Sequence, residues 1–329
     1  MQNLPKLSVF QWSGMMLVLF LGTLALMEFP VTAQVDSNRA AEGTSEPDNP
    51  DTKPAEAESP KDREAKDVPS TPAPEAKKLF ESAREKLANR MYRAKIVQKL
   101  SFPNRTLSAK GEILRGTKYR MRLEFEVQSG GTTGKLIQVC NGDKLWTERR
   151  VNDVPRLTVQ DVKEILSKVG PDPLRQNLVI AEMGLGGITS LLASLERTMN
   201  FEKPQSVVID GEELFRVDGK WNAAFLAKAK ASTEALQGMP DYIPDGARVY
   251  FDRDDFPRRI QYLKKEAKHD VLKPIVTLDF LDVEWLSEDE VKPSAFEYQP
   301  PERVFPEDVT KAYVDQLQPP TTPGAAPKP

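Results

Sequence analysis

Cysteine and histidine are almost absent from this sequence, and each absence excludes a class of protein. Cys140 is the only cysteine among 329 residues, so the chain cannot form an intrachain disulfide. His269 is the only histidine, which excludes histidine-rich metal sites and catalytic schemes that use several histidines. We interpret Cys140 as a small buried hydrophobe and His269 as a solvated residue of an exposed turn.

An excess of one charge is missing as well. The chain carries 46 Lys and Arg against 49 Asp and Glu, which gives no reason to expect nucleic acid or an anionic membrane surface as a partner. The serine-elbow motif G-x-S-x-G, the zinc motif H-E-x-x-H and the P-loop are absent. Asp252, Asp254 and Asp255 are closely spaced but lack the glycine and distal glutamate of a calcium loop. The sequence therefore predicts a non-enzymatic protein without a cofactor or metal site.

The N-terminus has the pattern of an export signal. Residues 1–33 combine Lys6, an apolar run from Gly14 to Met27, and a small-residue cleavage pattern that ends at Ala33. The apolar run is shorter than the roughly 20 residues that a membrane span needs. We expect a periplasmic or secreted protein, with a retained N-terminal membrane anchor as the alternative.

Two segments lack the apolar residues that a core requires. Residues 34–75 are rich in Pro, Glu, Ala, Asp, Lys and Ser, and residues 318–329 are rich in Pro. Such segments cannot bury enough apolar area to offset the loss of chain entropy. They are predicted to be a disordered linker and a disordered tail, which leaves residues 76–317 as the folded domain.

The clearest periodicity lies at Lys118–Gln128, which reads KYRMRLEFEVQ. Charged and polar residues alternate there with apolar ones, which are Tyr119, Met121, Leu123, Phe125 and Val127. A period of two predicts a long strand with one apolar and one solvated face. Such a strand is typical of an antiparallel sheet that is covered on one side.

Other segments complete the predicted fold. Helices are expected at Ala76–Arg90, Thr158–Lys168 and Asn222–Leu236, and within the apolar stretch Leu174–Met199. Strands are expected at Tyr92–Phe102, Thr106–Leu114, Lys135–Cys140, Lys144–Arg150, Gln205–Ile209, Glu213–Val217, Ala247–Asp252, Arg258–Lys264 and Pro274–Trp285. This order predicts an α+β fold in which about ten strands form one curved antiparallel sheet or incomplete β-barrel. The helices would cover its apolar, concave face.

Several motifs together resemble a known family. After the strand Pro274–Trp285, an aromatic and proline motif follows at Phe296, Tyr298, Pro300 and Pro301. A run of the form G-x-x-x-R-G-x-x-Y-R comprises Gly111, Arg115, Gly116, Tyr119 and Arg120, and a charged turn reads DRDDFPRRI at Asp252–Ile260. These features are similar to those of periplasmic outer-membrane lipoprotein carriers, the LolA-like group, whose F-x-F-x-P-P-like motif closes the sheet. The resemblance implies a LolA/LolB-like half-barrel that encloses an apolar cavity for acyl chains.

Two sets of residues are candidates for that function. The cavity wall would consist of Tyr119, Met121, Leu123, Phe125, Leu136 and Val139, which could equally pack under the helices as an ordinary core. A movable lid would consist of Gly186, Gly187, Ile188, Leu191, Leu192 and Leu195, which could equally be a turn before a core helix. We expect a monomeric carrier of lipid or lipoprotein acyl chains, without nucleic acid. The alternative is an envelope interaction or sensory domain with a filled core that docks a protein partner.

Overall fold

The computed structural model describes residues 71–102, 105–129, 132–152, 154–233, 243–266 and 271–317. The expected signal peptide, most of the expected linker, the expected tail and His269 lie outside these residues. The boundaries proposed for those segments therefore stay predictions.

A single sheet of thirteen strands organises the described part of the chain. Its order is β13-β6-β5-β4-β3-β2-β1-β12-β11-β10-β9-β7, and β8 also pairs with β9. The pairing of β13 with β6 is parallel and the other described pairings are antiparallel. The strands are β1 (Met91–Phe102), β2 (Arg105–Arg115), β3 (Met121–Ser129), β4 (Thr132–Cys140), β5 (Lys144–Val151), β6 (Val154–Asp161), β7 (Met199–Phe201), β8 (Gln205–Ile209), β9 (Glu212–Trp221), β10 (Gly246–Phe251), β11 (Pro257–Lys265), β12 (Leu272–Leu286) and β13 (Glu307–Asp308).

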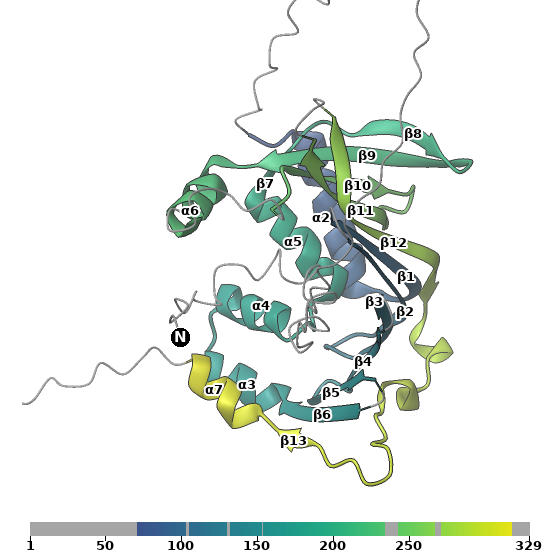
Figure 1. Ribbon diagram of the computed structural model, residues 1–329, viewed down its shortest axis with the longest axis vertical. Helices are drawn as coiled ribbons and strands as arrows, with labels where there is room; N and C mark the ends of the chain where they lie inside the picture. The colour runs from purple at the N-terminus through teal and green to yellow at the C-terminus, as the bar shows by residue number, and fades with distance from the viewer. Residues whose placement is uncertain are drawn as a thin grey trace, which may run out of the picture.

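Helices lie on the concave side of this sheet, which curves around α2, α4 and α5 (Figure 1). The two ends of the strand order do not pair with each other, so the sheet stays open. The predicted α+β fold with an incomplete, helix-covered barrel is confirmed. In the described residues the helices are α2 (Pro74–Asn89), α3 (Val162–Val169), α4 (Pro173–Glu182), α5 (Gly187–Thr198), α6 (Ala223–Thr233), α7 (Thr310–Leu317) and the 3₁₀ turns η3 (Glu288–Glu290) and η4 (Pro293–Phe296).

A dense core fills the space between α2, α5 and the strands near β7 and β10. Phe80 of α2 is fully buried, and its ring centroid lies 4.4 Å from that of Phe201 and 5.1 Å from that of Phe251. An ion pair of 2.5 Å between Arg84 and Glu196 joins α2 to α5. Close packing of this kind holds both helices firmly against the sheet.

After β12 the chain forms a strap, residues 287–306, along the convex side of the sheet, and then joins the sheet edge as β13. Phe296 is buried against Met91 and Leu114. A Cβ atom on Gly116 would lie only 2.8 Å from the Phe296 ring, which explains the glycine there. The Tyr298 ring stacks on Trp146 of β5 with centroids 6.4 Å apart. The aromatic pair of the closing motif thus fixes the strap to the sheet.

One predicted helix is wrong in its first turn. The stretch expected to be helical from Thr158 begins as β6, and α3 starts only at Val162. The Asp161 side chain accepts a hydrogen bond from the Glu164 backbone N–H at 2.8 Å and caps the helix. Val159, which lies in the predicted helix, pairs with Trp146 in the sheet instead.

The long alternating strand also begins later than predicted. Lys118 and Tyr119 have positive φ angles of 54° and 66°, so they form a turn, and β3 starts at Met121. The Arg120 backbone closes this turn by donating to the Thr117 carbonyl at 3.1 Å. The three additional strands include β7 and β13, which contain three and two residues and are too short for periodicity to reveal.

Replacement of Phe296 tests whether the strap stabilises the fold. Phe296→Ala should lower the free energy of unfolding by about 3–5 kcal/mol, because it empties a fully packed aromatic site. Urea denaturation followed by circular dichroism measures the change. Phe305→Ala is the control, since that side chain is 87% exposed and should change stability by less than about 0.5 kcal/mol. Equal effects of both substitutions would contradict the account.

Candidate functional site

A cavity of about 340 Å³ lies between the concave face of the sheet and the helices α4, α5 and α7. This volume falls near the lower end of the roughly 300–1,000 Å³ that small-molecule pockets occupy. The lining residues are Ile96, Ile113, Met121, Leu123, Leu136, Gln138, Thr147, Arg149, Arg156, Thr158, Gln160, Glu182, Met183, Gly184, Gly187, Ile188, Leu191, Leu278, Phe280, Val309 and Tyr313.

The inner part of the cavity is apolar. Strands β1, β2, β3 and β12 contribute aliphatic and aromatic side chains to it, and α5 contributes Ile188 and Leu191. Met121 on β3 is only 1% exposed and Leu123 is 5% exposed. An apolar surface of this kind binds hydrocarbon without directional contacts, and the flexible Met121 side chain can adapt to an irregular chain.

The register of the sheet makes the opposite end of the cavity polar. Leu123 lies opposite Gln138, Gln138 opposite Thr147, and Thr147 opposite Thr158. Residues directly opposite each other point to the same face. Along this row of paired residues, the concave face therefore changes from an aliphatic side chain on β3 to amide and hydroxyl groups on β4, β5 and β6.

Charged groups and a tyrosine complete the polar end. Arg149 and Arg156 come from β5 and β6, Glu182 from the end of α4, and Tyr313 from α7. The Tyr313 hydroxyl donates to Glu182 Oε2 at 3.1 Å and so connects α7 to α4. Burial raises the pKa of Glu182 above its ordinary value. The Arg156 side chain is 60% exposed, so the cavity meets solvent at this end.

Four of the six predicted wall residues share the concave face, but only three of them line the cavity. Met121, Leu123 and Leu136 are lining residues. Phe125 lies opposite Leu136 and is fully buried in the main core beside the cavity. Tyr119 belongs to the turn before β3 and packs against the same core.

The expectation that Val139 faces the cavity is wrong. Val139 lies opposite Arg122 and Trp146, on the convex face. Leu136 and Val139 are three residues apart in one strand, and side chains of a strand alternate with a period of two. The two residues therefore cannot share a face.

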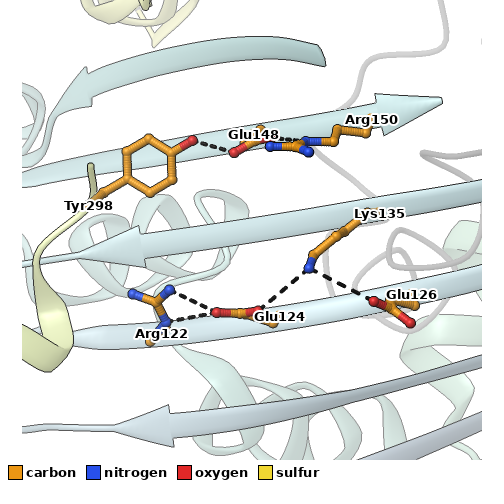
Figure 2. Close-up of polar contacts among 7 residues, drawn as sticks. All are labelled: Arg122, Glu124, Glu126, Lys135, Glu148, Arg150 and Tyr298. Carbon is orange, nitrogen blue, oxygen red and sulfur yellow. Dashed lines mark hydrogen bonds and ion pairs between the residues drawn. The ribbon is translucent and has the colours of Figure 1, made fainter. Parts of the chain in front are cut away.

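The convex face around Val139 is polar and carries ion pairs (Figure 2). Glu124 accepts from Arg122 at 2.8 Å and lies 3.8 Å from Lys135. Glu148 is only 2% exposed, and it accepts a hydrogen bond from Tyr298 and pairs with Arg150. The hydrogen bond from Tyr298 thus joins the strap to the convex face, and the cavity lies on the concave one.

The predicted lid residues divide between the cavity and the core. Gly187, Ile188 and Leu191 line the cavity, and Gly186 is the N-cap of α5. Leu192 and Leu195 are 0% and 2% exposed and belong to the main core. Helix α5 is thus one wall of the cavity and part of the packed core together.

A half-buried arginine fastens the turn between α4 and α5. Arg115 at the end of β2 donates through Nη1 to the Leu185 carbonyl at 2.7 Å. The Tyr92 hydroxyl lies nearby, hydrogen-bonds the Ile188 backbone, and has its pKa raised to about 12 by burial. Gly187 follows with a φ angle of +51°, which favours glycine. These contacts fix the position of the α5 N-terminus above the cavity.

The polar end contains the residues that the sequence analysis missed. Gln138 and Thr147 follow the strand alternation of β4 and β5, so an explicit register could have found them. Thr158 lies in the stretch that was predicted to be helical, so no register was available for it. Glu182 and Tyr313 come from helices 131 residues apart in the sequence. No local pattern signals that they meet.

Other chemical features do not form a site. In the described ranges, no group of three or more His, Cys, Asp and Glu side chains could hold a metal ion. Ser82 and Lys86 of α2 bond Asp255, so the charged turn at 252–255 contacts the first helix. Within the described residues, no single helix is long and apolar enough to cross a membrane. Helices α4 and α5 reach that length and hydropathy only when taken together, and the chain bends by 118° between them.

No protein-family model and no curated protein matches the chain. Solved structures give weak matches. MucB in complex with MucA(peri) has a TM-score of 0.31 at 11% identity, covering 65% of this chain and 58% of that one. LprF from Mycobacterium bovis has a TM-score of 0.30 at 11% identity, and the match covers 65% of this chain and 94% of LprF. A LolA superfamily protein from Nitrosomonas europaea has a TM-score of 0.25 at 9% identity, covering 69% and 99%. With TM-scores this low, the solved structures carry no argument about the ligand or activity of this chain.

Removal of the half-buried Arg115 guanidinium tests the anchoring of the α4–α5 turn. Arg115→Leu should lower the free energy of unfolding by about 1–3 kcal/mol, because the Leu185 carbonyl loses its donor. Arg93→Leu removes exposed ion pairs to Glu112 and Glu284 and should cost less than about 1 kcal/mol. Urea denaturation compares the two, and the Ile188 amide should exchange hydrogen faster only in Arg115→Leu. Slower or unchanged exchange there would contradict the assignment.

The thiol of Cys140 should be inert in the folded chain. Burial raises its pKa to about 11, so almost none is thiolate at about pH 8. Ellman's reagent should label one thiol per chain in denaturant and nearly none in native buffer. Rapid labelling of the native chain would show that this part of the concave face opens to solvent.

Proposed function

We propose that this protein binds a single-chain amphiphile in its cavity, with the hydrocarbon against β1, β2, β3 and β12 and the polar group at β5 and β6. The observation that supports this is the change from apolar to polar lining along one continuous cavity. The volume of about 340 Å³ suits one acyl chain better than several.

Non-directional contacts are suited to a carrier. Apolar burial contributes roughly 25 cal/mol per Å² whatever the fine structure of the chain, so related lipids can be held and released. No covalent step is needed. We therefore propose a lipid or lipoprotein-anchor carrier or binding protein of the bacterial envelope, exported by the N-terminal signal, rather than an enzyme.

The competing function is an envelope interaction or sensory domain with a filled core. The core under α2 and α5 is filled, as that function requires. The cavity beside it is a reason to prefer the lipid-binding function. Lipid-free protein that retains a specific envelope protein through purification would favour the alternative.

Two substitutions in the cavity wall test the proposal. Leu136→Trp fills the cavity without adding charge, and Leu123→Glu places a carboxylate against the hydrocarbon. Each should weaken binding of a fluorescent fatty acid to the full chain by at least about tenfold, equivalent to roughly 1.4 kcal/mol. Fluorescence titration measures the affinity.

Leu281→Glu is the matched control. Leu281 lies opposite Lys95, is 42% exposed and does not line the cavity, so its substitution should leave binding unchanged. Thermal unfolding of each variant establishes that it is folded. If folded Leu136→Trp and Leu123→Glu bind the fatty acid as tightly as the wild type, the cavity is not the binding site.

A further inference from the structure

Two arginines stand side by side at the polar end of the cavity. Arg149 of β5 lies directly opposite Arg156 of β6, and both line the cavity. Like charges directly opposite in a sheet are destabilising. The pair lies where the cavity meets solvent, so both guanidinium groups are placed to contact a ligand group there.

One carboxylate from the edge strand of the sheet lies beside the pair. Glu307 of β13 lies 3.7 Å from Arg156, and the two side chains are 62% and 60% exposed. Exposed ion pairs of this kind are worth little and exchange readily with other anions. Among the lining residues Glu182 is the single acid, so two arginines and one glutamate give a formal charge of +1.

The glutamate itself is already engaged. Its Oε2 accepts a hydrogen bond from the Tyr313 hydroxyl, and burial raises the pKa of Glu182, which disfavours the charged carboxylate. The remaining polar lining consists of neutral side chains, and the hydroxyls of Thr147 and Thr158 and the amides of Gln138 and Gln160 can donate hydrogen bonds. A group of oxygen acceptors fits this end better than an ammonium group does.

We propose that the cavity selects amphiphiles with an anionic oxyanion head group, phosphate or carboxylate, and that Arg149 and Arg156 recognise it. A guanidinium group binds such oxygens through two parallel hydrogen bonds. Arg149 shares a rung with Leu136, so a bound head group continues directly into the apolar wall. This inference rests on the proposed function and narrows its ligand to one charge class.

Four palmitoyl amphiphiles that differ in their head group test the selection. They are lysophosphatidylglycerol, palmitate, the zwitterionic lysophosphatidylcholine and the neutral monopalmitoylglycerol, each used to displace N-phenyl-1-naphthylamine from the full chain. Either anionic lipid should bind at least about tenfold more tightly than the neutral one. Comparing the first two distinguishes phosphate from carboxylate.

Variants assign the selectivity to the two arginines. Arg149→Gln and Arg156→Gln should each reduce the preference for the anionic lipid over monopalmitoylglycerol severalfold, because they weaken binding of the anionic lipid more than binding of the neutral one. Arg149→Lys keeps the charge without the paired donors and should lose part of the preference. Arg93→Gln, on the convex face, is the control and should alter neither affinity.

Two results separate the levels of the proposal. If all four lipids bind equally, or if the glutamine variants lose affinity for every lipid alike, head-group selection is overturned while lipid binding stands. If neither the naphthylamine probe nor any lipid binds the folded chain, the proposed function itself fails, and the selection fails with it.

Discussion

Cross-strand register is the constraint on which the rest of this structure depends. From β3 to β6 each residue is placed opposite a fixed partner, and the period of two assigns it to one face. On the concave face this gives the row Leu123, Gln138, Thr147 and Thr158, which changes from apolar to polar. On the convex face it gives the carboxylates and cations of Figure 2, which pair with one another, and Glu148 also accepts a hydrogen bond from Tyr298 of the strap. A slip of one residue would exchange the two faces and destroy both the cavity wall and the strap contacts.

The helices cover the sheet unequally, and this leaves room for the cavity. Helices α2 and α5 pack tightly near β7 and β10, where Phe80 meets Phe201. Near β5 and β6 the cover is made by α3 and α7, and Tyr313 joins α7 to Glu182 at the end of α4. The strap carries the chain along the convex side of the sheet and delivers α7 to that position, as Figure 1 shows. The tightly packed core thus lies near β7 and β10, and the polar end of the cavity lies near β5 and β6.

Local periodicity in the sequence was sufficient to predict the fold class and most of the helices and strands. The alternation at Met121–Gln128 identified a one-sided strand, and β8 has the predicted bounds. Errors arose where tertiary contacts decide. Val159 suits a helix or a strand, and pairing with Trp146 places it in the sheet. Val139 was predicted to line the cavity because it is hydrophobic, although its position in the strand places its side chain on the face opposite to that of Leu136. The contact of Glu182 with Tyr313 is invisible to any local pattern because it joins distant helices.

Native mass spectrometry of the full chain, purified under gentle conditions, tests the central claim most directly. The account predicts a population heavier than the chain by the mass of one amphiphile, and dissociation should release an ion with an anionic head group and one acyl chain. The same preparation of folded Leu136→Trp should show only the mass of the chain. A wild-type chain that stays free of ligand, even after incubation with saturating anionic lipid, would contradict the account.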